Sequence, residues 1–271
     1  MKILLEINDL SVEYYRNNAI IKAVRDFSLS VNEGETVGIV GESGSGKSTM
    51  ALAAMGLIWP REGKVTNGEI TFNGINLLSQ SPAQWQALRG NEISMIFQDP
   101  YTTFNPVLTI GSQILECITT HQKDITNIQA AALVDEALSD ARLPDTKRIY
   151  KSYAHQLSGG QLQRAAIAMA LCNKPKLLIA DEPTTALDVT IQREIMDLLE
   201  MLKTEHNLTI VFITHNLPLA HERCQKIAVM YGGQLVEFSD KESIFKSPQN
   251  PYTKELIKAI PKLMKSSQPN D

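Results

Sequence analysis

The segment GESGSGKS, residues 41–48, contains the residue types that bind nucleotide phosphates. It matches the pattern G-x-x-x-x-G-K-[S/T], in which glycines permit a tight loop whose backbone N–H groups point at phosphate oxygens. A strand-like run precedes the loop and helix-forming residues follow it, which disfavours a chance glycine-rich turn. The lysine is expected near the β- and γ-phosphates, and the last serine hydroxyl is expected to ligate Mg²⁺. The predicted phosphate-binding residues are Gly41, Glu42, Ser43, Gly44, Ser45, Gly46, Lys47 and Ser48.

Two carboxylates follow a hydrophobic run in the segment KLLIADEP, residues 176–183. In an open α/β sheet, ligands gather outside the carboxyl ends of the strands, so both carboxylates would face the bound phosphates. Asp181 suits Mg²⁺, directly or through water, and Glu182 suits a general base that polarises the attacking water. The alternative is a solvated Asp-Glu-Pro turn, which the presence of the phosphate loop disfavours.

Three other side chains with useful chemistry stand at the ends of predicted strands. Gln98 follows the run SMIF and could bind Mg²⁺ or the attacking water. His215 follows IVFIT and could donate a hydrogen bond to the γ-phosphate. Tyr14 ends an alternating strand and could stack on adenine, with Tyr15 as its direct competitor. The alternatives are that Gln98 is a turn residue, His215 a structural histidine and Tyr14 a core or edge tyrosine. Only the positions of these residues at the ends of predicted strands support their proposed roles.

The elements that must position these residues are indicated by two hydrophobic patterns. Alternating apolar residues predict half-buried strands of a small antiparallel layer, and they are Leu10, Val12, Tyr14, Phe27, Leu29, Val31, Ile70 and Phe72. Turns are predicted at Glu33-Gly34 and Asn73-Gly74. Continuous apolar runs, which suit strands buried on both faces of a parallel sheet, occupy residues 37–40, 93–97, 177–180 and 210–213.

A helical insertion is expected where the strand signals vanish, from about residue 110 to about 156. The segment 125–143 is rich in Ala, Leu and Glu and ends before Pro144, which predicts a helix. Residues 231–234 predict a late hairpin turn, and the segment SIFKSPQNPYTKELIKAIPKL predicts a short helix bracketed by prolines, followed by a polar tail.

Composition excludes several classes of function. The chain of 271 residues is 43% hydrophobic and 21% charged, as is ordinary for a soluble globular protein. Its net charge of −4 gives no sign of nucleic-acid binding. Its three cysteines lack metal-ligand spacing and are interpreted as reduced thiols in the cytosol. No secretory signal or membrane-spanning window is present, so other chains would have to supply any membrane path.

The order of these motifs resembles that of the ATP-binding-cassette ATPases, from about Leu4 to about Pro261. The segment most specific to this family is LSGGQLQR, residues 157–164. By itself it predicts only the start of a helix that contains glycines. The resemblance implies an α/β fold: a P-loop NTPase core with a mainly parallel sheet, an N-terminal antiparallel β layer and an inserted α-helical subdomain. It also implies a head-to-tail dimer that holds two ATP molecules, each between one subunit's phosphate loop and the other's signature helix.

The resemblance further implies a role for each motif residue. The signature residues Ser158, Gly159, Gly160 and Gln161 would bind the γ-phosphate of the partner's ATP, and Asp188 would cross the interface. Within the chain, Lys47, Ser48 and Thr49 would hold phosphates and Mg²⁺. Gln98 would bind Mg²⁺ and sense the membrane partner, and Glu182 would be the base. His215 would contact the γ-phosphate, and Tyr14 would stack on adenine.

The segments QDPYTTFNPVLTIGSQI, PTTALDVTIQ and NPYTKELIKAIP resemble the peptide/nickel branch of importer ATPases, which serves dipeptide, oligopeptide, nickel and metallophore uptake. Two departures stand out. Many peptide-importer relatives continue with a cysteine-bearing extension, whereas this chain stops at Asp271, which favours the shorter nickel or opine-metallophore type. Ala154 also stands where relatives often have proline, a departure of little consequence.

The expected protein is a single ATPase domain over residues 1–271. Its parts would be a nucleotide-binding core with the β layer (1–90 and 157–240), a helical subdomain (91–156), and a short C-terminal helix and tail (241–271). The resemblance implies a peripheral location on the cytoplasmic face of the membrane. The expected partners are two membrane permeases, docked on the helical insertion near Gln98, a second and different ATPase, and indirectly a substrate-binding protein, with no nucleic acid.

Two other functions are weighed against the importer. A non-transport ATPase of the same superfamily could act in DNA repair, translation or an enzyme complex. Repair versions contain long coiled coils and translation versions contain two cassettes, and this chain has neither. An export ATPase is less favoured, because exporters often fuse the cassette to membrane helices.

Overall fold

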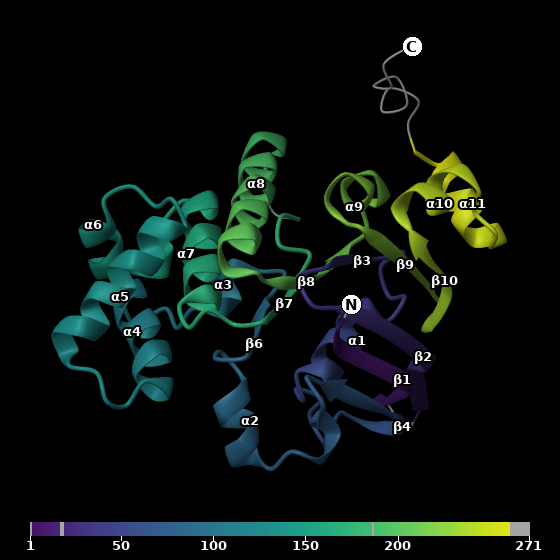
Figure 1. Cartoon of the computed structure of the whole chain (residues 1–271), viewed down its shortest axis with the longest axis horizontal. Helices are drawn as coiled ribbons and strands as arrows, with labels where there is room; N and C mark the ends of the chain where they lie inside the picture. Colours follow the sequence, from purple (N-terminus) through teal and green to yellow (C-terminus); the bar gives the residue numbers. More distant parts are fainter. Residues whose placement is uncertain (1, 17–18, 186, 261–271) are drawn as a thin grey trace. The chain divides into compact units, whose positions relative to one another are not determined.

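The computed structural model describes residues 2–16, 19–185 and 187–260. The chain divides into two compact units, the first formed by Met1–Ser79 with Val211–Asp271 and the second by Gln80–Ile210. In Figure 1 the first unit runs from purple to blue in its N-terminal part and from green to yellow in its C-terminal part, and the second unit runs from blue through teal to green.

The first unit contains a four-stranded antiparallel sheet. Its strands are β1 (Ile3–Arg16), β2 (Ala19–Asn32), β4 (Gly63–Phe72) and β5 (Ile75–Asn76), in the order β2-β1-β4-β5. The alternating apolar residues face the core, and Leu10, Val12 and Phe27 are completely buried. The predicted antiparallel layer and its turns at 33–34 and 73–74 are therefore confirmed.

The first unit also contains strands in the order β10-β9-β3-β8. Their bounds are β3 (Thr36–Val40), β8 (Thr209–Thr214), whose last four residues belong to this unit, β9 (Lys226–Tyr231) and β10 (Gln234–Asp240). Strands β3 and β9 are parallel, and β10 returns antiparallel to β9 through the turn predicted at 231–234. The helices described in this unit are α1 (Lys47–Ala54), α9 (Leu217–Arg223), α10 (Lys241–Lys246) and α11 (Pro251–Lys258).

The short helix expected between prolines is present as α11, but a second helix, α10, precedes it. The two are separated by the non-helical residues 247–250. Pro248 lies just after the end of α10, while Pro251 begins α11, where its fixed φ suits the first turn. The tail expected beyond Ile260 lies outside the described residues.

The second unit combines two parallel strands with most of the helices. Strand β6 (Ile93–Ile96) pairs in parallel with β7 (Leu177–Asp181). The helices are α2 (Pro82–Leu88), α3 (Pro100–Thr103), α4 (Ile110–His121), α5 (Asn127–Asp140), α6 (Thr146–Lys151), α7 (Gly159–Leu171) and α8 (Val189–His206). Short 3₁₀ turns cover Leu77–Ser79 in the first unit and Ala154–Gln156 in the second.

Helices α4, α5 and α6 pack on one another, and α4 and α5 also pack on α7 (Figure 1). Ile114, Ile118, Val134, Leu138 and Ile149 are completely buried among these helices. The helix predicted over 125–143 is α5, which begins after its N-cap Thr126, the partner of Gln129 in a capping box, and ends before Arg142 adopts a positive φ. Helices α3–α6 fall within residues 91–156, together with strand β6, and a separate subdomain with these bounds stays a prediction.

Two further sequence expectations concern membranes and thiols. Among the described residues, no helix combines the length and apolarity needed to cross a bilayer. Cys117, Cys172 and Cys224 are free thiols, and the last two are buried. Burial raises the pKa of Cys172 to about 12 and also raises the pKa of Cys117, so both thiols stay protonated near neutral pH.

Candidate functional site

The phosphate loop connects β3 to α1 in the first unit. Gly44 and Gly46 have positive φ values of 80° and 101°, which favour glycine. Gly46 also lies so close to the Ala23 carbonyl of β2 that a Cβ would collide with it. Gly46 is the N-cap of α1 and supplies no side-chain acceptor, so the first N–H groups of this helix are suited to an anionic ligand.

Lys47 is held across this loop and is only 4% exposed. Its Nζ donates hydrogen bonds to the carbonyl oxygens of Gly41 and Glu42, at 2.8 and 2.9 Å, and to the Ser45 hydroxyl at 3.4 Å. The ammonium group is therefore held against the residues at the start of the loop, which the sequence predicts to bind phosphates. Ser48 is exposed and Thr49 is half-buried on the first turn of α1.

The predicted adenine contact, Tyr14, lies near the end of β1, opposite Ile21 of β2 and Gly63 of β4. Gly63 packs against its ring, because a Cβ on Gly63 would lie 2.7 Å from Tyr14 Cδ1. Tyr15, the competitor, is 43% exposed and points to the other face of the strand. The stacking role of Tyr14 stays a prediction.

His215 is exposed and directly follows strand β8, as the sequence predicts. The next residue, Asn216, caps α9 and donates its N–H to the Thr214 hydroxyl at 3.0 Å. His215 is therefore fixed between a strand end and a helix start.

Gln98 and Glu182, which the sequence places after separate strands, are in contact in the second unit. Gln98 Nε2 donates to Glu182 Oε2 at 3.3 Å. Thr185, which sequence reasoning missed, donates its hydroxyl proton to the same oxygen at 2.7 Å. Glu182 has a φ of 47°, an unfavourable backbone conformation for this residue type that occurs more often at functional sites. Its carboxylate is thus oriented by two side chains beside buried Asp181, the last residue of β7.

The signature segment forms the start of helix α7. Ser158 is the N-cap, and its hydroxyl accepts the Gln161 N–H at 3.3 Å, while the Gln161 side chain accepts the Ser158 N–H at 3.3 Å. This capping box leaves Ser158 exposed and Gly159 and Gly160 half-buried.

The start of α8 lies beside the signature segment. A Cβ on Gly160 would be 3.0 Å from the Ile191 side chain, and one on Gly159 would be 3.5 Å from Leu187. Asp188 is the N-cap of α8, and its carboxylate accepts the Ile191 N–H at 3.0 Å. Ser158 and Asp188 are therefore exposed caps of two helices that start side by side.

The structure thus assigns the predicted residues to two sets. The phosphate loop, Tyr14 and His215 belong to the first unit, whereas Gln98, Asp181, Glu182, the signature segment and Asp188 belong to the second. Throughout the described ranges, no three His, Cys, Asp or Glu side chains gather as a metal-binding group. The predicted Mg²⁺ ligands are instead a hydroxyl, an amide oxygen and one carboxylate, which are oxygen donors that suit this hard cation.

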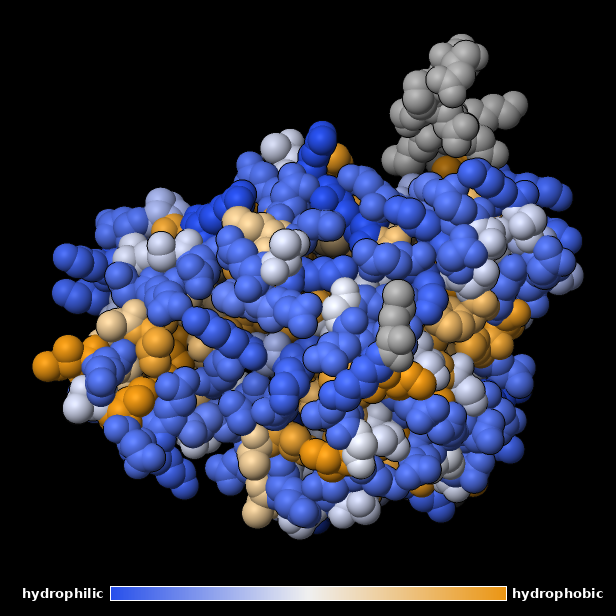
Figure 2. Space-filling view, in the orientation of Figure 1, coloured by the Kyte–Doolittle hydropathy of each residue, from blue (hydrophilic) through white to orange (hydrophobic). Residues whose placement is uncertain are grey.

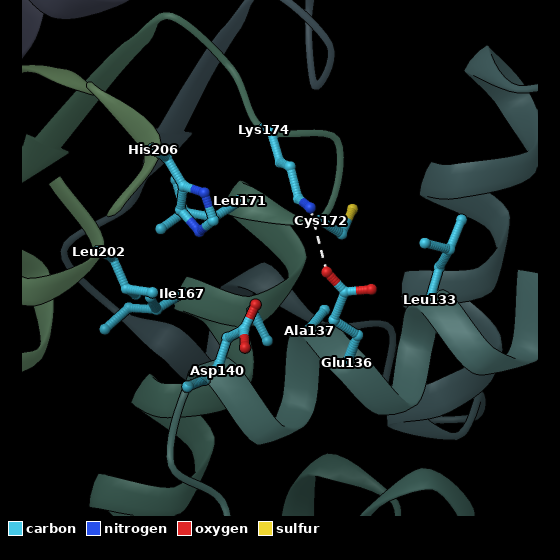
Figure 3. Close-up of a pocket in the computed structure, with 12 residues that line it drawn as sticks. Leu133, Glu136, Ala137, Asp140, Ile167, Leu171, Cys172, Lys174, Leu202 and His206 are labelled. Atoms are coloured by element: carbon cyan, nitrogen blue, oxygen red, sulfur yellow. Dashed lines mark hydrogen bonds and ion pairs between the residues drawn. The ribbon is translucent and has the colours of Figure 1, made fainter. Parts of the chain in front are cut away.

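A pocket in the second unit has a different lining. Figure 3 shows it among α5, the end of α7 and α8, with Lys174 Nζ bonded to Glu136 Oε1 at 3.0 Å. Its volume of about 20 Å³ holds about one water molecule. None of its lining residues is among those predicted for ATP.

This combination of phosphate loop, strand-end carboxylates and signature helix defines a nucleotide-binding cassette. The ABC transporter family model matches residues 24–185. The chain belongs to this family and is one of its ATPases. A second model, the oligopeptide/dipeptide transporter C-terminal region, matches residues 236–270.

The similar proteins are ATP-binding proteins of dipeptide and oligopeptide transport. Over 98% of its length, the chain is 47% identical to the dipeptide transport ATP-binding protein DppD of Escherichia coli K12, of which 80% is covered. Over 96% of its length, it is 44% identical to the oligopeptide transport ATP-binding protein OppD of Salmonella typhimurium, of which 77% is covered. These similarities confirm the predicted ATPase that energises import, and neither protein supports a non-transport role.

Solved structures confirm the predicted fold. The dimeric ATP-binding cassette MJ0796, in a post-hydrolysis state bound to ADP and Pi, matches with a TM-score of 0.78 and 30% identity, covering 88% of this chain and 99% of that one. CbiO1 of Clostridium perfringens matches in fold, with a TM-score of 0.77, 24% identity and coverage of 98% of each chain.

The Glu182→Gln variant is expected to bind ATP with an affinity within about threefold of the wild type, because glutamine has nearly the same size and shape as glutamate. Hydrolysis should fall by about 10²- to 10⁴-fold, because an amide cannot accept the proton of the attacking water. Equilibrium ATP binding and phosphate release measure the two effects. Glu92→Gln, which removes a carboxylate paired with Lys176, is the matched control and should hydrolyse ATP normally. Normal turnover by Glu182→Gln would remove Glu182 as the base.

Two Ser158 variants separate capping from phosphate binding. Ser158→Ala should destabilise the protein by about 1 kcal/mol, because it removes the N-cap acceptor, whereas Ser158→Asn retains a capping side chain. If the hydroxyl also binds the partner's γ-phosphate, both variants should lose hydrolysis at least about tenfold while only the alanine variant melts at a lower temperature. Full ATPase activity in the Ser158→Asn variant would show that Ser158 serves only as a helix N-cap.

Proposed function

We propose that this chain binds and hydrolyses ATP–Mg²⁺ to drive the uptake of small peptides through a multi-subunit importer. The cargo class rests on one observation, the match of residues 236–270 to the oligopeptide/dipeptide transporter C-terminal region. The cargoes named for the two relatives, dipeptides and oligopeptides, support it. Neither of these relatives is named for nickel or an opine metallophore, so peptides are favoured here over those two cargoes, although the sequence by itself favoured the nickel or opine-metallophore type.

In the proposed reaction, the loop N–H groups and Lys47 hold the β- and γ-phosphates, and Tyr14 holds the adenine. A water oxygen attacks the γ-phosphorus, the bond to the β–γ bridging oxygen breaks, and ADP and phosphate form. Glu182 accepts the proton of the attacking water, while Gln98 and Thr185 fix the carboxylate in place. His215 donates a hydrogen bond to the γ-phosphate as its charge develops.

Magnesium fits the oxygen donors that the chain offers. Ser48, Gln98 and Asp181 would hold Mg²⁺, directly or through water. The bound ion would neutralise charge on the phosphate oxygens.

The closed state is proposed to be a head-to-tail pair with a second, similar ATPase. Ser158, Gly159, Gly160 and Gln161 would present the start of α7 to the partner's γ-phosphate, and the 13-residue α7 supplies the positive dipole end. The exposure of Ser158 and Asp188 supports this role, since both side chains are accessible to a second subunit. The relative in the post-hydrolysis state is likewise described as dimeric.

We place the permease contact on an apolar docking surface in the second unit, just after Gln98. Four exposed side chains form it: Tyr101, Val107, Leu108 and Tyr153. A β-bridge between Thr109 and Tyr153 brings the segments together, and Val107 is 75% exposed. Exposed apolar residues also occur elsewhere in this unit, and Figure 2 shows some of them where α4 and α5 lie. Exposed apolar side chains that cluster in this way are typical of protein contacts. Such docking would place the chain on the cytoplasmic face of the membrane.

Val107→Asp tests the docking surface, because a buried carboxylate without a partner opposes an apolar interface. Copurification with the two permeases should fall at least about tenfold, while ATP binding by the separate chain stays unchanged. Ile128→Asp is the matched control, since Ile128 is 84% exposed but lies on α5, outside this surface. Release of the permeases by Ile128→Asp, and not by Val107→Asp, would contradict the assignment.

Reconstitution tests the cargo. Vesicles with the copurifying permease pair, this chain, its partner ATPase and the binding protein should take up a labelled dipeptide only with ATP and Mg²⁺. Unlabelled peptides should compete with this uptake, and Ni²⁺ should not. ATP-dependent uptake of Ni²⁺ or a metal chelate without peptide uptake would overturn the peptide assignment.

A further inference from the structure

The C-terminal region returns to the phosphate loop through Tyr252 of helix α11. The Tyr252 hydroxyl oxygen accepts the backbone N–H of Glu42 at 3.3 Å, across 210 residues of sequence. Glu42 is the second residue of the loop, so this contact is at the point where the chain leaves strand β3. Tyr252 belongs to the region 236–270 that matches the peptide-transporter C-terminal model. The sequence of the phosphate loop does not predict its contact with Tyr252.

Helix α11 is fixed so that Tyr252 faces this N–H. Its cap, Asn250, accepts the Tyr252 N–H at 2.9 Å. The Glu237 carboxylate of β10 accepts the N–H groups of Gln249 and Asn250 at 2.8 and 3.0 Å. Burial opposes ionisation of Glu237, but these N–H donors hold its pKa below the ordinary value, so the carboxylate stays charged at neutral pH. The start of α11 is therefore attached to β10.

Strands β9 and β10 contact other residues of the same loop. The Met230 carbonyl lies so close to Gly41 that no Cβ would fit, and the Gly233 N–H donates to the Ser45 carbonyl at 3.0 Å. Tyr231, between them, packs on Tyr252, with the ring centroids 4.3 Å apart. The β9–β10 turn and α11 thus hold the loop at three residues.

We propose that Tyr252 is a positioning residue for nucleotide binding, through which the C-terminal region holds the start of the phosphate loop. A loop with three glycines loses much conformational freedom when it closes around phosphates. A contact that restrains the loop beforehand lowers this entropic cost and so raises nucleotide affinity. Tyr252 occupies the Glu42 N–H and leaves the later N–H groups of the loop for the phosphates. Its hydroxyl is not bonded to Glu182 or His215, which are proposed to act on the attacking water and the γ-phosphate, so the chemical step should not depend on it. The inference rests on the proposed phosphate-binding role of this loop.

The state of the hydroxyl suits this role. Burial raises the pKa of Tyr252, so its hydroxyl stays neutral at physiological pH. A neutral oxygen accepts the Glu42 N–H without placing a negative charge near the phosphates.

Tyr252→Phe in the full chain removes the acceptor and keeps the ring against Tyr231. The dissociation constants for ADP and for ATP without Mg²⁺, measured by titration calorimetry, should rise about three- to tenfold, as for the loss of one neutral hydrogen bond. The value of kcat should stay within about twofold, and KM should rise with the dissociation constant. Tyr252→Ala, which also removes the ring contact, should weaken binding further.

Tyr231→Phe is the matched control, because it deletes the hydroxyl of the adjacent ring and leaves the Glu42 contact intact. It should bind nucleotide as the wild type does. Unchanged affinity in Tyr252→Phe, an equal loss in Tyr231→Phe, or a fall in kcat at constant affinity would each overturn the inference.

Lys47→Ala separates this inference from the proposed function. It should lose nucleotide binding at least about tenfold, and normal binding would reject the phosphate loop itself. A loss in Lys47→Ala together with wild-type binding in Tyr252→Phe would reject only the role of Tyr252.

Discussion

The site depends on how closely other backbone segments approach a loop made largely of glycine. Gly41 lies against the Met230 carbonyl of β9, and Gly46 lies against the Ala23 carbonyl of β2. Neither position has room for a Cβ, so glycine is required there by packing as well as by conformation. Lys47 then bonds to carbonyls of the same loop and closes it. The loop is thus shaped by two strands and its own lysine, and the geometry that is proposed to bind phosphates follows from that packing.

Gln98 and Glu182 are in contact because each follows the end of a strand in the same parallel pair. The sequence places each just after a buried apolar run, and such runs are typical of parallel strands. Strands β6 and β7 are parallel neighbours, with Ile96 in register with Ala180. The segments that follow the two strands therefore leave the sheet at the same end, beyond the carboxyl ends of the strands. Two local signals and one rule of topology thus predicted that both residues serve one site, but their direct contact across 84 residues is seen only in the structure. The antiparallel layer and the turn before β10 were predicted in the same way, from alternation and turn residues.

Other features could not be predicted because no local signal specifies them. The contact between Tyr252 and Glu42 depends on the path of α11, and nothing near Tyr252 indicates which loop it reaches. The C-terminal segment shows several prolines, but a proline can end one helix or begin the next, and the sequence alone led to one helix where there are two. Thr185 lies in the segment PTTALDVTIQ, but its hydrogen bond to Glu182 depends on the turn after β7.

Ser158 and Asp188 raise the question of whether a capping side chain can also serve a second subunit. The Ser158 oxygen accepts the Gln161 N–H through a lone pair, which leaves its O–H proton free to be donated. Asp188 accepts the Ile191 N–H through Oδ1, and a carboxylate has further acceptor sites on its other oxygen. Capping therefore does not exhaust either group. It fixes the position of each oxygen at an exposed helix start, so that any group presented by a partner meets a donor or an acceptor whose position is already set.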